Sequence, residues 1–523
     1  METQASVAKG ATSLYLANVI SLIANALYFL VLTNVLGTLQ VGIITALNLM
    51  IWFLVTVCLF AQPIVLQSPI PAPLAVLKFL PELLAKNDRG GAKKVLTTSL
   101  LSATLMGAGI AAVLFAFPSQ IILLFGGNSI SPDLIRLTAI EVLLLAAGQV
   151  CLGAIVGLKN TRAASVYIVV WNMLRYAFAS ILLVSHAVLG VLLGWIIGDA
   201  ILLLLTLRKS LRGLSRAEEA ATHFSIANLA GYSLYTLFAA VMGVAVSQLD
   251  KIITLGHKGL AQLAIYNVAI VASSFAGFAS YALLTALLPT IASLFASSRT
   301  EEMRNVIRDC TRYVSIGVIP IAIGFAAVTE IPLLMFGQEY VTGLVPSMIV
   351  SVATGLTALG VVYADVLLSL GKLRWCTAAN LLGLAGLLVV STLLTPLLGL
   401  NGPALGRASL AAIVTLVYAF ATMKSGFFEL DLRAFLSATA GSGVMGVLVF
   451  SALSSVHSFY LKLAVLPVLI AVGALIYIGF LRLLRVVTIS DIDLIRSFIP
   501  HKLRRLLPAI AMLLGLRYDL RER

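Results

Sequence analysis

Long hydrophobic stretches separated by short polar breaks run along most of the chain, from Ala11 to Leu484. Most of them hold about 20 residues or more, enough for a helix rising about 1.5 Å per residue to cross an apolar layer about 30 Å thick. Charged residues and Pro/Gly clusters mark the breaks. The pattern predicts fourteen membrane-spanning helices, at residues 11–35, 41–66, 95–117, 134–157, 163–185, 187–207, 228–256, 260–294, 313–335, 344–370, 375–397, 402–422, 434–455 and 462–484.

The composition agrees with this pattern and excludes a water-soluble globule. Hydrophobic residues make up 60% of the chain and charged residues 11%, whereas about a quarter of the residues of a soluble protein are charged. We therefore expect an all-α polytopic membrane protein. The first stretch, Ala11 to Val35, is longer than the apolar region of a signal peptide and lacks a small-residue cleavage site, which favours a retained helix.

Basic residues gather in every second loop. The chain has 35 Lys and Arg against 21 Asp and Glu, and most of the basic residues lie in one alternate set of loops, such as the one from Arg208 to Arg216. In a soluble protein this excess would suggest nucleic acid, but membrane topology explains the alternation more simply. Positive loops face the cytoplasm, so we expect a plasma-membrane protein with both termini inside and no nucleic-acid partner.

The chain also repeats itself. The sequence GTLQVGI, Gly37 to Ile43, follows the first span, and GLAQLAI, Gly259 to Ile265, follows the seventh. Further matches keep the same order, which predicts two related six-helix lobes around a central cavity, with two helices added. The predicted parts are a first lobe at 1–207, a cytoplasmic linker at 208–227, a second lobe at 228–422, two extra helices at 434–484 and a basic amphipathic tail on the membrane surface at 485–523.

Eight charged residues fall inside the predicted spans. A charge at mid-span costs about 2.5 to 3.5 kcal/mol on insertion scales, so such groups pair with each other or face a water-filled cavity. Four acids and four bases leave both interpretations open. Asp250 and Asp365 are the candidates for ion coupling, because carboxylates at depth titrate readily. The eight residues are Arg136, Glu141, Arg175, Asp199, Asp250, Lys251, Asp365 and Arg407.

Uncharged polar residues form stripes along single helix faces. In the first span they recur every three or four residues, and spans 2, 5, 7 and 8 carry similar stripes. A stripe can equally join two helices, but stripes in matching helices of both copies favour a polar cavity that hydrogen-bonds and stacks on a sugar-rich cargo. The candidate cargo-binding residues are Asn18, Asn25, Asn48, Trp52, Asn172, Arg175, Tyr266 and Arg407.

Nothing in the sequence indicates catalysis. The chain lacks a phosphate-binding glycine loop and a metalloprotease histidine pair, and its five histidines lie in loops, at span ends or in the tail. The four cysteines, Cys58, Cys151, Cys310 and Cys376, have no spacing typical of a metal site. We therefore expect no enzyme and no cofactor, and transport that is driven by a gradient.

Several passages resemble one transporter family across almost the whole chain. They are SQLDKIITLGHKGLAQLAIYNVA from Ser247, LLPTIASLFASS from Leu287, LMFGQEYVTG from Leu334, and LLSLGKLRWCTAANLLG from Leu367 with LLTPLLGLNGPALG from Leu393. The chain is similar to the polysaccharide-transporter, or O-antigen-type flippase, family of the multidrug/oligosaccharidyl-lipid/polysaccharide exporter superfamily.

This resemblance implies alternating access between two lobes and a polyprenyl-linked oligosaccharide carried from the cytoplasmic to the outer leaflet. It also implies that cavity cations meet the lipid pyrophosphate, for which Arg175 and Arg407 are the candidates here. Expected partners are the lipid-linked oligosaccharide, membrane lipids and glycan polymerase or glycosyltransferase machinery, with the chain itself a monomer. Lipid II flippases of the superfamily tend to carry arginines in the first two spans, where this chain has none.

The alternative is a cation-coupled multidrug exporter of the same superfamily that uses Asp250 and Asp365. Such exporters usually have twelve spans and often an acid in the first span, where this chain has Asn18 and Asn25.

Overall fold

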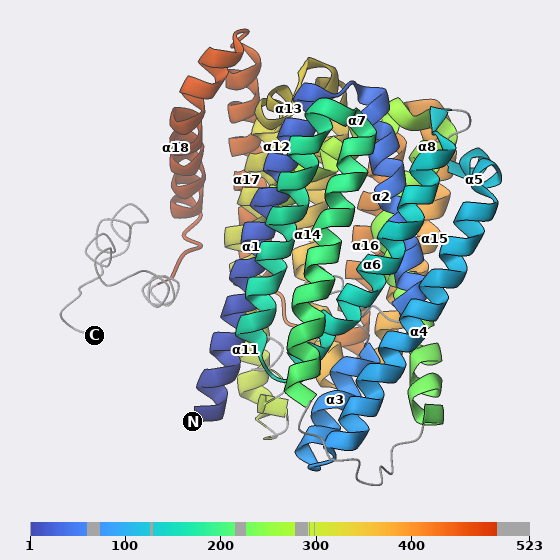
Figure 1. Cartoon of the computed structure of the whole chain (residues 1–523). Helices are drawn as coiled ribbons and strands as arrows, with labels where there is room; N and C mark the ends of the chain where they lie inside the picture. Colours follow the sequence, from blue (N-terminus) through green and yellow to red (C-terminus); the bar gives the residue numbers. More distant parts are fainter. Residues whose placement is uncertain are drawn as a thin grey trace. The chain divides into compact units, whose positions relative to one another are not determined.

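The computed structural model describes residues 2–59, 74–125, 129–214, 226–277, 291, 293–295, 297 and 299–488. Within these ranges the backbone is helical almost throughout and contains no β-strand. Twelve helical stretches of the described part are long and apolar enough to cross a membrane. The prediction of an all-α polytopic membrane protein is therefore confirmed (Figure 1).

The helices follow the predicted spans and add short elements between them. The first half contains α1 (Glu2–Val35), α2 (Thr38–Leu59), α3 (Leu74–Ala85), α4 (Arg89–Ala116), α5 (Pro118–Phe125), α6 (Pro132–Gly157), α7 (Thr161–Leu214) and α8 (Ile226–Ser273). The second half contains the short turn η2 (Ser274–Gly277), α11 (Thr300–Tyr313), the π-helical turn η3 (Val314–Val318), α12 (Ile319–Val328), α13 (Glu330–Phe336), the short turn η4 (Gln338–Gly343), α14 (Leu344–Ser369), α15 (Leu373–Leu398), α16 (Asn401–Lys424), α17 (Leu432–Ser454) and α18 (Phe459–Leu483).

Two of the twelve candidate spans are too long for one crossing. Thr161–Gly213 holds 53 residues and Val241–Gly277 holds 37. At about 1.5 Å per residue the first would extend about 80 Å, far beyond an apolar layer of about 30 Å. Each is interrupted by one residue with a left-handed backbone, Ala187 (φ 48°) and Gly259 (φ 78°). These breaks fall where the sequence predicts the fifth and seventh spans to end, while the total of fourteen spans stays a prediction.

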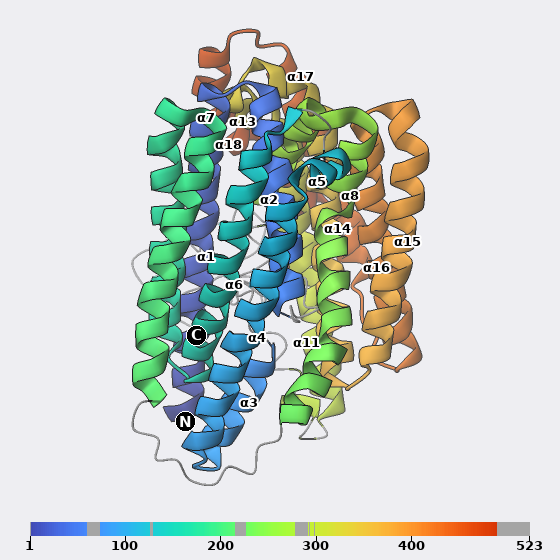
Figure 2. The same cartoon turned by 45° about the vertical axis from the view of Figure 1, so that its right-hand side comes forward.

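The two halves of α7 form a tight antiparallel hairpin (Figures 1 and 2). Three glycines at every fourth position allow this approach, because a Cβ atom there would collide with the first half of the helix. A Cβ would lie 2.1 Å from Leu182 O at Gly190, 2.2 Å from Ala179 N at Gly194, and 2.7 Å from Arg175 Cα at Gly198. Small residues at such spacing let membrane helices pack backbone to backbone.

The matching helices of the second copy use the same arrangement. Between α15 and α16 the chain turns at Gly399, whose φ is 61°. A Cβ at Gly402 would lie 2.4 Å from the nitrogen of Thr395, and one at Gly406 would clash with the hydroxyl of Ser391. The glycine-spaced helices that the sequence aligns as repeats therefore close against their preceding helices in the same way.

The chain divides into two compact units. The first unit contains residues 1–268, 336–343 and 387–406, and the second contains 269–335, 344–386 and 407–523. In the first unit, α6 packs against α7, α4 and α2, and α1 lies along α7. In the second unit, α12 packs against α14 and α17, and α17 packs against α18. The lobe boundaries predicted from span counting stay a prediction.

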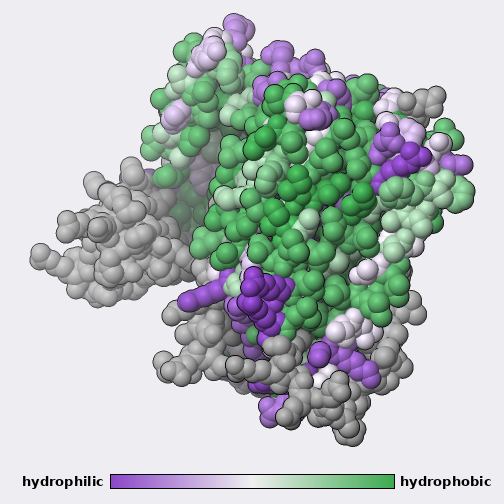
Figure 3. All heavy atoms as spheres, in the orientation of Figure 1, coloured by the Kyte–Doolittle hydropathy of each residue, from purple (hydrophilic) through white to green (hydrophobic). Residues whose placement is uncertain are grey.

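Apolar side chains cover the face of α1 and α7 that Figure 3 shows, with polar side chains gathered toward the helix ends. Large aliphatic side chains of these two helices are exposed, among them Leu27, Ile181 and Val184. A soluble protein rarely exposes a continuous apolar face of this size, whereas lipid covers one without cost. The protein is a multi-pass membrane protein. The predicted surface tail lies outside the described residues from residue 489, and so do residues 215–225 of the predicted linker.

Candidate functional site

A buried ionic cluster joins α6 to both halves of α7 in the first unit. Arg175 Nη2 donates a hydrogen bond to Glu141 Oε1 at 2.7 Å, and Arg175 Nε lies 3.9 Å from Asp199 Oδ1. The side chains of Glu141 and Asp199 are fully buried, and that of Arg175 is 4% exposed. Gly198 brings Asp199 to this point, because it lets the second half of α7 touch the backbone of Arg175.

Aromatic side chains enclose the guanidinium group of Arg175. Its Cζ lies 4.7 Å from the ring centre of Trp195 and 5.8 Å from that of Trp171. Trp171 also donates its Nε1 hydrogen to Asp199 Oδ1. An arginine over an aromatic face gains electrostatic attraction that grows as water is removed. The tryptophans therefore stabilise the cation and exclude water.

Helix α1 closes the cluster from the other side. The ring of Tyr28 stacks on that of Tyr176, with the centres 4.8 Å apart. Tyr28 and Trp195 are each 3% exposed. Tyr176 follows Arg175 in the chain, so this stacking places Tyr28 beside the cluster.

Several polar atoms of the cluster have no hydrogen-bond partner among the described residues. They are Glu141 Oε2, Asp199 Oδ2, Arg175 Nε, Tyr28 Oη and Trp195 Nε1. Buried polar atoms are nearly always satisfied in native proteins, and a group of orphans in one place indicates water or a bound ion. The cluster therefore offers both hydrogen-bond acceptors and donors to a bound water molecule or ion.

The polar stripes of the first and fifth predicted spans face each other. Ser165 shares a hydrogen bond of 3.0 Å with Ser13, and Asn172 donates to Ser21 Oγ at 3.1 Å. These hydrogen bonds link α1 to α7, so this part of the stripes joins two helices. The candidates Asn18 and Asn25 on α1, and Asn48 and Trp52 on α2, are half-buried in the same unit.

A second buried carboxylate pairs with a tyrosine within α8. Tyr266 donates its hydroxyl hydrogen to Asp250 Oδ2 at 2.7 Å, and both side chains are fully buried. The break at Gly259 folds the helix so that these residues meet. The structure thus joins a predicted ion-coupling residue to a predicted cargo-binding residue. Thr254, on the same predicted stripe, donates to the backbone oxygen of Asp250.

The two repeated sequence motifs also touch. Gly42 of the first motif lies so close to Leu260 of the second that a Cβ would be 2.0 Å from its backbone oxygen. Both residues belong to the first unit. The remaining candidates belong to the second unit, where Asp365 on α14 is 7% exposed and Arg407 on α16 is half-buried.

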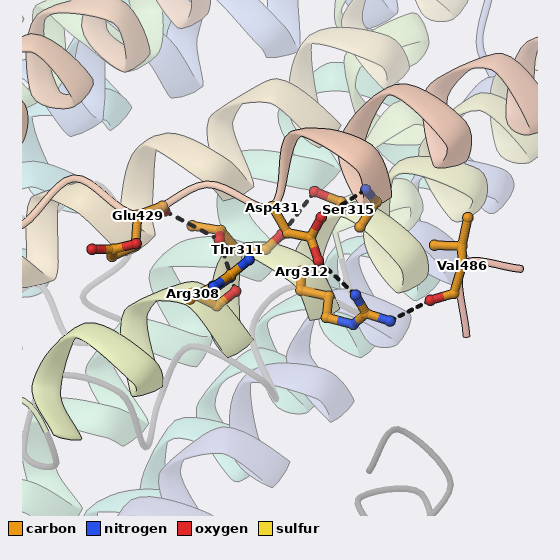
Figure 4. Close-up of polar contacts among 8 residues, drawn as sticks. Arg308, Thr311, Arg312, Ser315, Glu429, Asp431 and Val486 are labelled. Atoms are coloured by element: carbon orange, nitrogen blue, oxygen red, sulfur yellow. Dashed lines mark hydrogen bonds and ion pairs between the residues drawn. The ribbon is translucent and has the colours of Figure 1, made fainter. Parts of the chain in front are cut away.

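A polar clasp in the second unit joins α11, the segment before α17 and the chain after α18 (Figure 4). Arg312 Nη1 donates to Asp431 Oδ2 at 2.5 Å, and Nη2 donates to the backbone oxygen of Val486. Asp431 also accepts from Ala434 N at 3.0 Å and so caps α17. Arg304 pairs with Glu429 at 3.2 Å.

The clasp shifts the ionisation of its carboxylate. Partial burial alone would raise the pKa of Asp431, but the Ala434 N–H, the hydrogen bond and charge of Arg312 and the charge of Arg308 outweigh it. The pKa of Asp431 is therefore lower than usual, and its ionised form is stabilised in the folded protein.

Two further contacts hold α18 against this unit. Lys462 Nζ pairs with Glu330 at 2.6 Å, and Tyr477 donates to the backbone oxygen of Ile316 at 2.8 Å. Ile316 lies in the π-helical turn η3, where the backbone hydrogen bonds are displaced and a carbonyl is available. The clasp and these contacts tie the two added helices to α11, η3 and α13.

The sequence pointed to some of these groups and missed others. It marked Arg175, Glu141 and Asp199 as intramembrane charges, but it assigned only Arg175 to a site. It did not single out Trp171 or Trp195. The spacing of Gly190, Gly194 and Gly198 was the available signal, because it predicts close contact with a neighbouring helix. Among the described residues no group of three or more His, Cys, Asp or Glu could hold a metal ion.

Comparison with known proteins shows a shared fold. No family model matches the sequence, and no curated protein matches it. The fold of this chain is similar to that of several solved membrane transporters. The lipid II flippase MurJ in an inward closed conformation is 14% identical, with a TM-score of 0.67 over 89% of this chain and 97% of that one.

Two MATE transporters are similar over a smaller part of the chain. An inward-facing MATE family multidrug resistance transporter is 11% identical, with a TM-score of 0.62 over 78% of this chain and 94% of that one. A mutant of the Vibrio cholerae MATE transporter VcmN is 16% identical, with a TM-score of 0.59 over 82% of this chain and 100% of that one.

Proposed function

We propose that the protein is a flippase that moves a polyprenyl-linked oligosaccharide from the cytoplasmic to the outer leaflet by alternating access. The observation that carries this proposal is the extent of the fold match. The likeness to the lipid II flippase covers 89% of the chain, whereas the likeness to the two MATE transporters covers 78% and 82%. The longer match favours a carrier of lipid-linked cargo.

The polar residues of the membrane-spanning helices support the same kind of cargo. Asn18, Asn25, Asn48 and Trp52 are half-buried, so each residue is partly accessible. Amides and an indole suit a ligand that is rich in hydroxyl groups and is held by hydrogen bonds and stacking. We propose these four residues as the sugar-contacting set. The other two uncharged candidates, Asn172 and Tyr266, are already hydrogen-bonded to Ser21 and Asp250 and are left out of it.

The pyrophosphate of the cargo needs a cation. Arg407 is half-buried on α16 and is the more accessible of the two candidates. Arg175 is 4% exposed and already paired with Glu141, so it can meet cargo only by leaving that partner. We therefore propose that Arg407 contacts the pyrophosphate directly and that Arg175 acts inside its own unit.

The location and partners follow from this role. We propose that the protein works in the plasma membrane beside glycosyltransferases or a glycan polymerase. The basic residues of every second loop support a topology with both termini inside. The cation-coupled drug exporter is the competing function. The buried pair of Asp250 and Tyr266 favours it, since a buried carboxylate in a membrane-spanning helix is a typical ion site of transporters.

Glycan export in cells tests the proposal. Arg407→Gln should reduce the amount of surface glycan strongly at equal protein abundance. Arg136→Gln is the matched control, because Arg136 is half-exposed and paired with Asp133 three residues away, and it should export normally. Full glycan export by the Arg407→Gln variant would show that Arg407 is not needed to bind the cargo. Normal glycan export in a strain without the protein, combined with lost drug resistance, would favour the exporter.

A further inference from the structure

The ionic cluster of the first unit contains more negative than positive charge. The charged and titratable groups facing it are Glu141 on α6, Arg175, Tyr176 and Asp199 on α7, and Tyr28 on α1. The other helices packed on α6 place no further cation at the cluster. Helices α2 and α5 have no charged residue, and the charges of α4 lie in its first two turns, at Arg89, Lys93 and Lys94. Lys78 and Glu82 of α3 lie near the C-terminal end of α6, where Gly157 approaches Leu80. Two carboxylates therefore face one guanidinium.

Such a site cannot keep both carboxylates ionised while it is sealed. Removing a charge from water is expensive, and one arginine compensates only one carboxylate. Glu141 and Asp199 approach the same guanidinium group, at 2.7 Å and 3.9 Å, and each retains a buried oxygen without a hydrogen-bond partner among the described residues. Two carboxyl groups in this arrangement hold one proton between them, because a shared O–H···O bond satisfies both orphan oxygens.

We propose that Glu141 and Asp199 share one exchangeable proton beside Arg175, and that this proton couples the transport cycle to a proton gradient. The second half of the statement rests on the proposed transport function. The step is a simple protonation: an O–H bond forms on a carboxylate oxygen when a proton arrives from water, and the same bond breaks when it leaves.

The surrounding groups explain how release changes the structure. With the proton bound, the cluster is neutral overall and stable without water. After release, one uncompensated negative charge remains, and it needs new donors. Tyr28 Oη and Trp195 Nε1 are two buried donors without a partner in the described structure. They can bind the ionised carboxylate or an entering water, so release favours a hydrated arrangement of α1, α6 and α7.

Tryptophan fluorescence can follow this proton directly. Trp171 and Trp195 contact Asp199 and Arg175, while the other two tryptophans, Trp52 and Trp375, are removed in a Trp52→Phe/Trp375→Phe parent. The purified full chain is titrated from about pH 5 to about pH 9, the range that buried carboxyl groups reach. We expect a reversible transition of one proton in the parent, and no transition in Glu141→Gln or Asp199→Asn built on it.

The control keeps the same helix and the same chemistry. Asp133→Asn also removes an acid from α6, but Asp133 is exposed at the helix start and paired with Arg136. This variant should keep the full transition. A parent without any transition overturns the proposal even if a cluster variant fails to fold. A transition that survives in both Glu141→Gln and Asp199→Asn overturns it as well.

Proteoliposomes test the coupling. The probe is a polyprenyl-pyrophosphoryl N-acetylglucosamine with a fluorescent tag, whose arrival in the other leaflet is read by an impermeant quencher. A pH gradient should raise the rate of probe transfer several-fold with the wild-type protein and leave the rate with Glu141→Gln unchanged. An equal rise in the rate with both proteins would overturn the coupling. A wild-type protein that moves no probe contradicts the proposed function, whereas the fluorescence titration still decides the shared proton.

Discussion

Gly198 lies against Arg175 so closely that a Cβ on the glycine would be 2.7 Å from the arginine Cα. The next residue, Asp199, is thereby fixed beside the guanidinium group. A backbone contact between two halves of one helix thus determines where an intramembrane cation meets its anion. The glycine at position 198 therefore allows the close helix packing that positions Asp199 in the candidate proton site.

Gly198→Ala should destabilise the protein by about 1 to 3 kcal/mol, the usual cost of forcing an extra methyl group into a packed interior. The helix hairpin must open to admit the Cβ, and Asp199 then moves away from Arg175. Thermal unfolding of the purified protein measures the effect. Gly109→Ala is the control, because nothing lies within 4 Å of a Cβ at Gly109 on α4, and its melting temperature should stay equal or rise.

Arg175→Met should destabilise by about 3 to 5 kcal/mol, because it leaves a buried carboxylate without its counter-ion. Glu141→Gln added to this variant should recover part of the loss, since the remaining acid can then stay protonated. Denaturation of the two single variants and the double variant measures the coupling. Independent, additive effects would show that the two side chains do not form a functional pair in the membrane.

Tyr266→Phe should cost about 1 to 3 kcal/mol, the range for leaving a buried hydrogen-bond partner unsatisfied. The change removes only the hydroxyl group that donates to buried Asp250. Tyr460→Phe is the control, because Tyr460 on α18 is 81% exposed and should show no change in stability. Equal melting temperatures for both variants would contradict a structural or ionic role for the Asp250–Tyr266 pair.

The clasp of Arg312 and Asp431 should give a pH-dependent stability. The folded-state pKa of Asp431 is lowered, so the stabilisation is complete above the unfolded value of about 4 and is lost as the pH falls through the folded value. Asp431→Asn should therefore be less stable than wild type at neutral pH, and the difference should shrink toward about pH 3. A difference that is constant over this range would show that the charge of Asp431 contributes nothing.

The sequence predicted the helical class and several exact breaks, because span length and loop charge depend on the membrane alone. Gly259 interrupts α8 where the hydropathy pattern places the gap, since glycine readily adopts a positive φ. The break at Ala187 also falls at a predicted span end, but its residue type gave no signal of a positive φ. Alanine rarely adopts φ 48°, and here the packing of the α7 hairpin imposes it.

The ionic cluster was only half visible in the sequence. Helical periodicity shows which residues share a face, but it does not show which helix lies opposite that face. Arg175 was therefore recognised as an unusual cation, while its partner Glu141, 34 residues earlier, was one of several possible acids. Trp171 and Trp195 gave no signal, because an aromatic residue in a span is equally compatible with lipid, a neighbouring helix or a buried guanidinium group.

Leaflet exchange of the tagged polyprenyl-pyrophosphoryl N-acetylglucosamine in proteoliposomes tests the central claim most directly. Vesicles containing the full chain should expose the probe to the impermeant quencher much faster than empty vesicles, and vesicles containing Arg407→Gln should approach the empty rate. Equal exchange in protein-containing and empty vesicles, with a cationic drug moved instead, would contradict the flippase account and identify a multidrug exporter.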